Sequence, residues 1–126
     1  MRGQAGFFDV EERLKELSAK GDAAGALDEF LTYLKAIPDD VQAHELTGRI
    51  YVSMGNVAES IPHFRKAVEL EPNNSALETN LGVALAMAGD LPAAVTAFES
   101  ALRADPSNQT ASENLAKARA SLGKKP

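Results

Sequence analysis

Apolar residues recur every three or four positions along most of this chain, with polar residues between them. This spacing puts the apolar side chains on one side of an α-helix. The pattern is interrupted at regular points by glycine or proline, residues that end helices. We therefore expect a series of short amphipathic helices joined by tight turns. Seven such helices are expected, and each follows an N-cap residue with a side-chain oxygen: Asp9, Asp22, Asp40, Asn56, Asn74, Asp90 and Asn108.

The interrupting glycines and prolines recur every 34 residues, and so does one aromatic position. The three columns of this repeat are Gly21, Gly55 and Gly89; Phe30, Phe64 and Phe98; and Pro38, Pro72 and Pro106. A fixed period of this length is typical of stacked repeat architectures. It predicts an all-α fold of three helix-turn-helix units, at residues 7–40, 41–74 and 75–108, within a single domain over 7–126. Residues 1–6 are expected to form a flexible N-terminal tail, and a polar helix over about 109–122 is expected to cap the last apolar face.

The repeat also carries particular residues on its helices. The third unit has Leu81, Gly82, Ala94, Phe98, Ala101 and Pro106; the second has Gly48, Tyr51, Phe64, Ala67 and Pro72; the first keeps Ala26, Phe30 and Pro38. These positions resemble the tetratricopeptide-repeat (TPR) pattern, and the likeness covers about nine-tenths of the chain. The resemblance implies a right-handed α-solenoid in which the first helix of each unit lines a concave groove. It also implies that a partner protein binds in that groove.

Composition and charge narrow the function further. The 126 residues include 44% hydrophobic and 25% charged residues, no cysteine, and a net charge of −5, which disfavours nucleic acid as a partner. The sequence has no secretory signal and no apolar stretch long enough to cross a membrane, so we expect a cytoplasmic protein. His44 is expected to pack between helices and His63 to face outward. With no phosphate loop and no metal-ligand cluster, we expect neither an enzyme nor a cofactor or metal.

Candidate groove residues follow from the positions of the first helices and the capping helix. An acid–base pair recurs at Glu11–Lys15, Glu45–Arg49 and Glu113–Lys117, and such pairs also stabilise a helix by about 0.2–0.5 kcal/mol with no ligand. The third unit has Thr79 and Val83 in place of this pair, with Ala86 and Met87 nearby. This apolar patch could anchor one side chain of a partner, or its residues could equally pack against the capping helix. The predicted groove set is Lys15, Glu45, Arg49, Val52, Thr79, Asn80, Val83, Met87, Asn114 and Lys117.

These observations predict a non-enzymatic scaffold that binds a peptide or helix of a partner protein. The alternative is a structural self-assembly unit, a possible homo-oligomer, that pairs through Phe7 and Phe8 at an uncapped N-terminal end. One partner class is disfavoured, because TPR domains that clamp chaperone C-terminal tails use a set of Lys, Asn and Arg. The matching positions here are Glu11, Lys15, Leu46, Ala76 and Asn80, of which only Asn80 agrees.

Overall fold

The computed structural model is all-α and describes residues 12, 16 and 19–123. The described residues form six helices: α2 (Ala23–Ala36), α3 (Val41–Ser53), α4 (Val57–Leu70), α5 (Ser75–Met87), α6 (Leu91–Ala104) and α7 (Gln109–Gly123). The expected total of seven helices is therefore not seen in this part of the chain. The expected helix after Asp9 lies mostly outside it, as do the N-terminal tail, Glu11, Lys15 and the self-assembly candidates Phe7 and Phe8.

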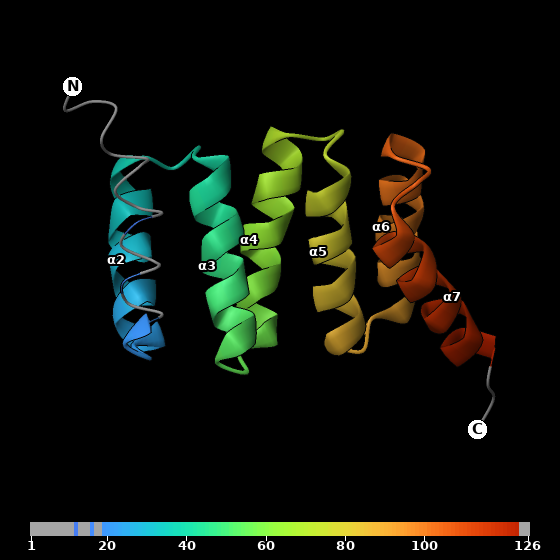
Figure 1. Cartoon of the computed structure of the whole chain (residues 1–126), viewed down its shortest axis with the longest axis horizontal. Coiled ribbons are helices and arrows are strands. Elements are labelled where there is room, and N and C mark those ends of the chain that lie inside the picture. Colours follow the sequence, from blue (N-terminus) through green and yellow to red (C-terminus); the bar gives the residue numbers. More distant parts are fainter. Residues whose placement is uncertain (1–11, 13–15, 17–18, 124–126) are drawn as a thin grey trace.

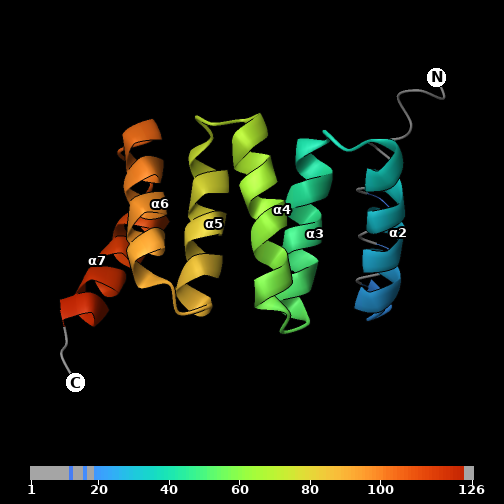
Figure 2. The same ribbon diagram turned by 180° about the vertical axis from the view of Figure 1, so that it is seen from behind.

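The helices follow one another along the long axis of the molecule in sequence order (Figures 1 and 2). Each helix packs on the next one in the chain, and α5 also contacts α7. In Figure 1, α3 lies in front of α4 and α7 lies in front of α6, and the view from behind in Figure 2 reverses this order. The pairs α3/α4 and α5/α6 are thus successive helix-turn-helix units of a stack, as the 34-residue period predicted.

The helix boundaries follow from caps and glycines that the sequence shows. The N-cap side chains of Asp22, Asp40, Asn74, Asp90 and Asn108 each accept a hydrogen bond from a backbone N–H three residues on. Asn56, the expected cap of α4, makes no such bond. The turns inside the units place Gly21, Gly55 and Gly89 at φ of 73°, 82° and 92°, a conformation that side chains disfavour.

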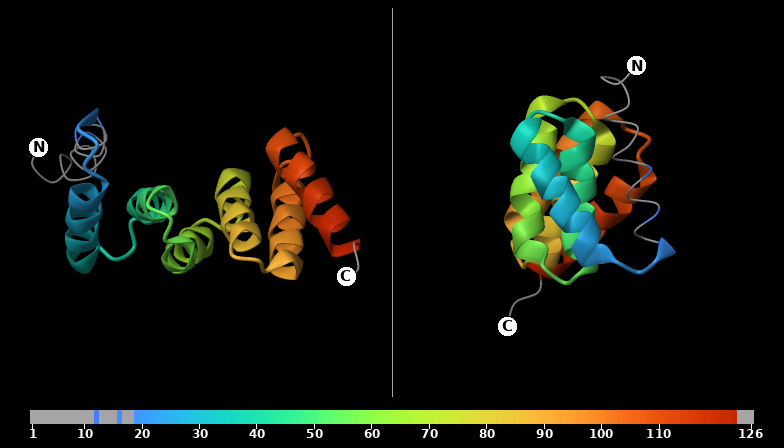
Figure 3. Two further views of the ribbon diagram at one scale, coloured as in Figure 1. Left: turned by 90° about the horizontal axis from the view of Figure 1, so that it is seen from below. Right: turned by 90° about the vertical axis from the view of Figure 1, so that its left-hand side faces the viewer.

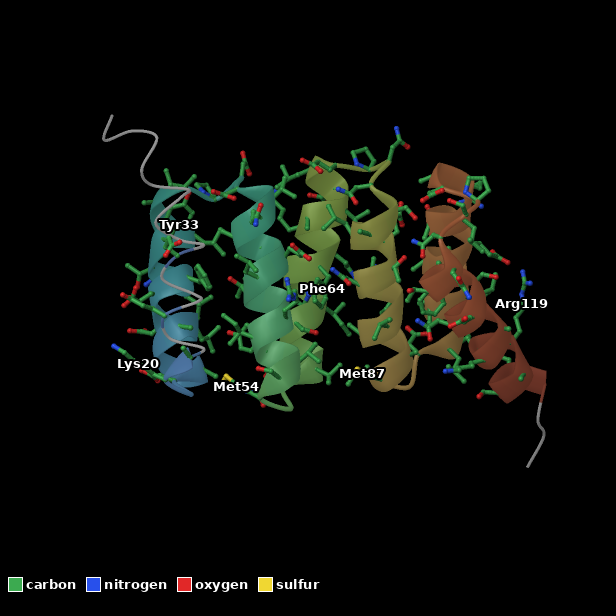
Figure 4. All side chains as sticks on the ribbon, in the orientation of Figure 1. Lys20, Tyr33, Met54, Phe64, Met87 and Arg119 are labelled. Carbon is green, nitrogen blue, oxygen red and sulfur yellow. The ribbon has the colours of Figure 1, made fainter. Side chains whose placement is uncertain are left out.

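The phenylalanine column forms the centre of the core. Phe30, Phe64 and Phe98 are 2%, 3% and 1% exposed. Phe64 extends from α4 toward α3 (Figure 4), and a Cβ placed on Gly48 of α3 would lie 2.7 Å from its ring. The same contact recurs between Phe98 of α6 and Gly82 of α5, where the distance would be 2.5 Å. The two glycines therefore let the paired helices approach closely.

Pro62 lies inside α4 without ending it, and its ring is exposed. At this sixth position of the helix, the proline removes one backbone hydrogen bond. None of the helices over the described ranges has the length and apolar content that crossing a membrane requires.

Candidate binding surface

One face of the stack is built by α3, α5 and α7, and we call it the odd-helix face. It carries Glu45 and Arg49 of α3, Asn80 and Val83 of α5, and Asn114 and Lys117 of α7. In the left panel of Figure 3, α3 lies on one side of α4 and α7 lies on the same side of α6. Most of the predicted groove residues in the described part of the chain belong to this face.

Polar contacts join α3 to α5 on this face. Glu45 forms an ion pair with Arg49 one turn later, with 3.9 Å between Oε2 and Nη1. The same Glu45 oxygen accepts a hydrogen bond from the Asn80 side-chain amide at 3.0 Å. The Arg49 side chain is 62% exposed, whereas that of Glu45 is 23% exposed. The side chains of Glu45 and Asn80 are thus held in place, while the Arg49 guanidinium extends toward solvent.

A pocket of about 320 Å³ opens where α5, α6 and α7 meet. Its walls are mainly apolar, with polar groups from α7 on one side. The lining residues are Val83, Ala86, Met87, Leu91, Phe98, Asn114, Lys117, Ala118 and Ser121. The structure therefore brings together four predicted groove residues, namely Val83, Met87, Asn114 and Lys117. Met87 is 55% exposed near the end of α5 (Figure 4), so it lies at the rim of this pocket.

Two polar side chains of this pocket, Asn114 and Lys117, have no partner among the residues that the structure describes. Within the described part of the chain, neither the Asn114 amide nor the Lys117 ammonium group makes a hydrogen bond or an ion pair. The expected Glu113–Lys117 pair does not form among the described residues, and Glu113 accepts a hydrogen bond from Gln109 at 3.0 Å. The pocket thus presents an apolar surface flanked by one cation and one amide that are both available to a ligand.

Two predicted groove residues lie elsewhere. Thr79 is only 6% exposed, and the prediction that it lines an open groove is wrong. Its hydroxyl donates to the Ser75 carbonyl at 2.8 Å and accepts from the Asn108 amide at 3.0 Å, so it joins α5 to the start of α7. Val52 is half-buried and packs against the main hydrophobic cluster.

A pair of histidines in the second unit was not expected. The Nδ1 atoms of His44 and His63 lie 3.1 Å apart, so the prediction that His63 simply faces outward is wrong. His44 Nε2 lies 2.7 Å from the Pro38 carbonyl oxygen and must donate to it, so in the neutral ring His44 Nδ1 accepts from His63. Burial and the neighbouring His44 lower the pKa of His63. No group of three or more metal-binding side chains occurs among the residues that the structure describes.

The sequence matches the family model described as "Tetratricopeptide repeat" over residues 12–75, 47–108 and 79–126. No curated protein matches the sequence. Among solved structures, MamA is 27% identical with a TM-score of 0.82, and the match covers 86% of this chain and 63% of MamA. The chain therefore spans less than two thirds of that relative.

Two TPR domains of RPAP3 are similar in fold. The first TPR of Spaghetti (RPAP3), solved with the HSP90 peptide SRMEEVD, is 20% identical with a TM-score of 0.85, and the match covers 93% of both chains. The second TPR domain of human RPAP3, solved with the HSP70 peptide SGPTIEEVD, is 19% identical with a TM-score of 0.83. That match covers 92% of this chain and 97% of the human domain. At this level of identity, both likenesses concern the fold alone.

Proposed function

Because this chain belongs to the tetratricopeptide-repeat family, we propose that it is a non-enzymatic interaction module that binds a segment of a partner protein on its odd-helix face. The observation that supports this function is the pocket at α5, α6 and α7. It combines an apolar surface with two polar groups that have no partner in the described chain. A partner segment would place one large apolar side chain in the pocket and satisfy both groups.

The odd-helix face would be presented by a solenoid of repeated units. Three units over residues 7–108 would form a right-handed solenoid within a single domain over 7–126, with a concave odd-helix face. The polar helix α7 would act as the cap, since it buries Ala111, Leu115 and Ala118 and exposes most of its other residues.

The chemistry of the pocket indicates what a partner segment must carry. An acidic residue beside the large apolar one would pair with the Lys117 ammonium group, and a backbone carbonyl or N–H of the segment would pair with the Asn114 amide. The exposed Arg49 guanidinium on the same face favours a further acidic group. We therefore propose a segment with one apolar anchor and nearby carboxylates.

The chaperone tails bound by the RPAP3 domains are not the partner that we propose. Of the three described positions that match the clamp, Leu46 is 4% exposed and turned into the core. Ala76 offers no polar group, and the Asn80 amide is already bonded to Glu45. These positions provide no clamp for a C-terminal carboxylate, so we expect amidation of that carboxylate in SRMEEVD to leave the affinity of the peptide for this chain unchanged. A loss of affinity on amidation would contradict this exclusion.

A peptide library displayed on phage tests the function without a known partner. Peptides selected on the wild-type chain are then measured against Lys117→Glu and against Ala58→Glu. Both residues are exposed, but Ala58 lies on α4, outside the odd-helix face, so the second variant controls for the added charge. We expect Lys117→Glu to weaken binding at least tenfold by repelling acidic groups, and Ala58→Glu to leave it unchanged. Equal binding to all three proteins would contradict the proposed site.

A further inference from the structure

A second pocket, of about 340 Å³, lies between α5 and α6 and reaches the edge of α4. It shares no lining residue with the pocket of the odd-helix face. Leu81, Leu85 and Ala97 form its apolar part, Glu78 lies inside it, and Arg65 and Arg103 also line it. Nothing in the proposed interaction function uses this pocket.

The internal repeat explains why the pocket exists. Glu78, Leu85 and Ala97 stand 34 residues after His44, Tyr51 and His63. In the second unit these positions hold three rings, with 5.3 Å between the centroids of His44 and His63 and 5.7 Å between those of Tyr51 and His63. In the third unit they hold no ring at all. The same place is therefore filled by aromatic side chains in one repeat and open in the next.

The polar groups of the pocket are incompletely paired. Glu78 is only 7% exposed, and its one described hydrogen bond comes from the neutral Ser100 hydroxyl at 2.7 Å. No buried side-chain oxygen of the described residues lacks a partner, so the second Glu78 oxygen is accessible and can accept from a further donor. Arg65 and Arg103 are both exposed, and neither guanidinium has an ion pair or hydrogen bond within the described chain. The pocket thus offers an acceptor inside and two free cations near its opening.

We propose that this pocket binds a small aromatic acid whose ring carries an N–H group. The ring takes the place that three rings occupy in the second unit. Its N–H donates to the Glu78 carboxylate, and the acid group at the opposite end of the molecule pairs with Arg65 and Arg103. This orientation keeps the carboxylate of the ligand away from Glu78, so the ligand enters with its ring first.

The experiment uses indole-3-acetate as the probe, because it has a ring N–H at one end and a carboxylate at the other. The chain contains no tryptophan, so the fluorescence of the indole ring reports binding directly. We expect a saturable change in this fluorescence and shifts of the α5 and α6 amide resonances. Indole lacks the acid group and phenylacetate lacks the N–H. Each is expected to bind about tenfold more weakly, with phenylacetate measured by competition.

The double variant that tests the site gives the third unit two side chains of the second unit. Glu78→His combined with Ala97→His introduces the two residues found at the equivalent positions, fills the pocket and replaces the carboxylate by a ring. We expect it to lose indole-3-acetate binding while it keeps its helical circular dichroism. Ala116→His, on an exposed position of α7, is the matched control and should bind as the wild type does.

Two results would overturn the proposal: no saturable signal with the folded wild-type chain up to millimolar probe, or unchanged binding by the double variant. If phenylacetate bound as tightly as indole-3-acetate, the ring N–H would add nothing to the affinity. Glu78 would then not be its hydrogen-bond acceptor. Lys117→Glu should leave probe binding unchanged, so the outcome is independent of the peptide-binding function.

Discussion

At the scale of single residues, the distance between paired helices depends on contacts between phenylalanine rings and glycine backbones. Phe98 lies directly over Gly82, and Phe64 lies over Gly48. A glycine inside a helix costs up to about 1 kcal/mol relative to alanine, because the unfolded chain is more flexible. Close packing of a buried ring against the bare backbone offsets that cost.

Gly82→Ala tests this contact. The new methyl group would lie 2.5 Å from Cε1 of Phe98, so either the ring or the helix must move. We expect a loss of about 1–3 kcal/mol in the free energy of unfolding, even though alanine is the better helix former. Urea denaturation measures this loss, and Gly123→Ala is the control because a Cβ there meets no atom within 4 Å. A more stable Gly82→Ala variant would contradict the packing argument.

The histidine pair predicts a dependence of stability on pH. Burial is the main reason why the pKa of His63 lies below its usual value of 6.5, and the neighbouring His44 lowers it further. Between the lowered pKa and 6.5 the unfolded chain therefore binds more protons than the folded chain, so stability falls as pH falls through this range.

We expect His63→Phe to show a smaller loss of unfolding free energy between pH 7.5 and pH 5 than the wild type. The phenylalanine keeps a ring beside His44 but does not titrate. Urea denaturation across this pH range measures the difference. An equal dependence on pH in both proteins would mean that His63 does not contribute to it.

The sequence predicted the burial of some of these residues, but it could not predict the contacts of others. The burial of the three phenylalanines follows from their shared column. The burial of Thr79 does not, because its position on the first helix of a unit matches that of groove residues. Its bond to Asn108, 29 positions along the chain, decides its orientation. The contact between His44 and His63 likewise depends on how α3 packs on α4, which no local pattern shows.

At the scale of elements, the start of α7 is held by more than a local cap. The Asn108 side-chain oxygen accepts from Ala111 N–H at 3.0 Å, as expected for an N-cap. Its amide nitrogen also donates to the hydroxyls of Ser75 and Thr79 on α5, at 2.7 and 3.0 Å. The cap residue thus fixes α7 against α5, the two helices that share the apolar pocket of the odd-helix face.

Asn108→Ala is therefore expected to cost more than an ordinary cap substitution. Loss of the cap and of both inter-helix bonds should lower the free energy of unfolding by about 2 kcal/mol. Asn56→Ala is the matched control, because Asn56 occupies the same type of position without a side-chain cap bond, and it should cost less than about 0.5 kcal/mol. Equal costs in chemical denaturation would show that the bonds to α5 contribute nothing.

At the scale of the whole molecule, the stack is held together by contacts between successive helices. Most buried apolar residues of the described chain belong to two clusters, and the larger one runs from Phe64 of α4 to Ala118 of α7. The smaller one joins α2 to α3 through Ala26, Phe30, Leu46 and Ile50. The 34-residue period predicted this arrangement because each unit repeats the same contacts. It could not predict which units pack best, since that depends on substitutions within the columns.

Stability should therefore vary along the stack. In a linear array each unit gains stability only from its neighbours, so a region with a small buried cluster opens more often than one with a large cluster. We expect native-state hydrogen exchange to protect the amides of α5 and α6 most, and those of α2 least among α2 to α6. Phe98→Ala removes the central ring of the larger cluster and should reduce protection in α5 and α6 far more than in α2. Equal protection of α2 and α5 in the wild type would instead show a single cooperative unit, in which the uneven packing of the two clusters has no effect on local opening.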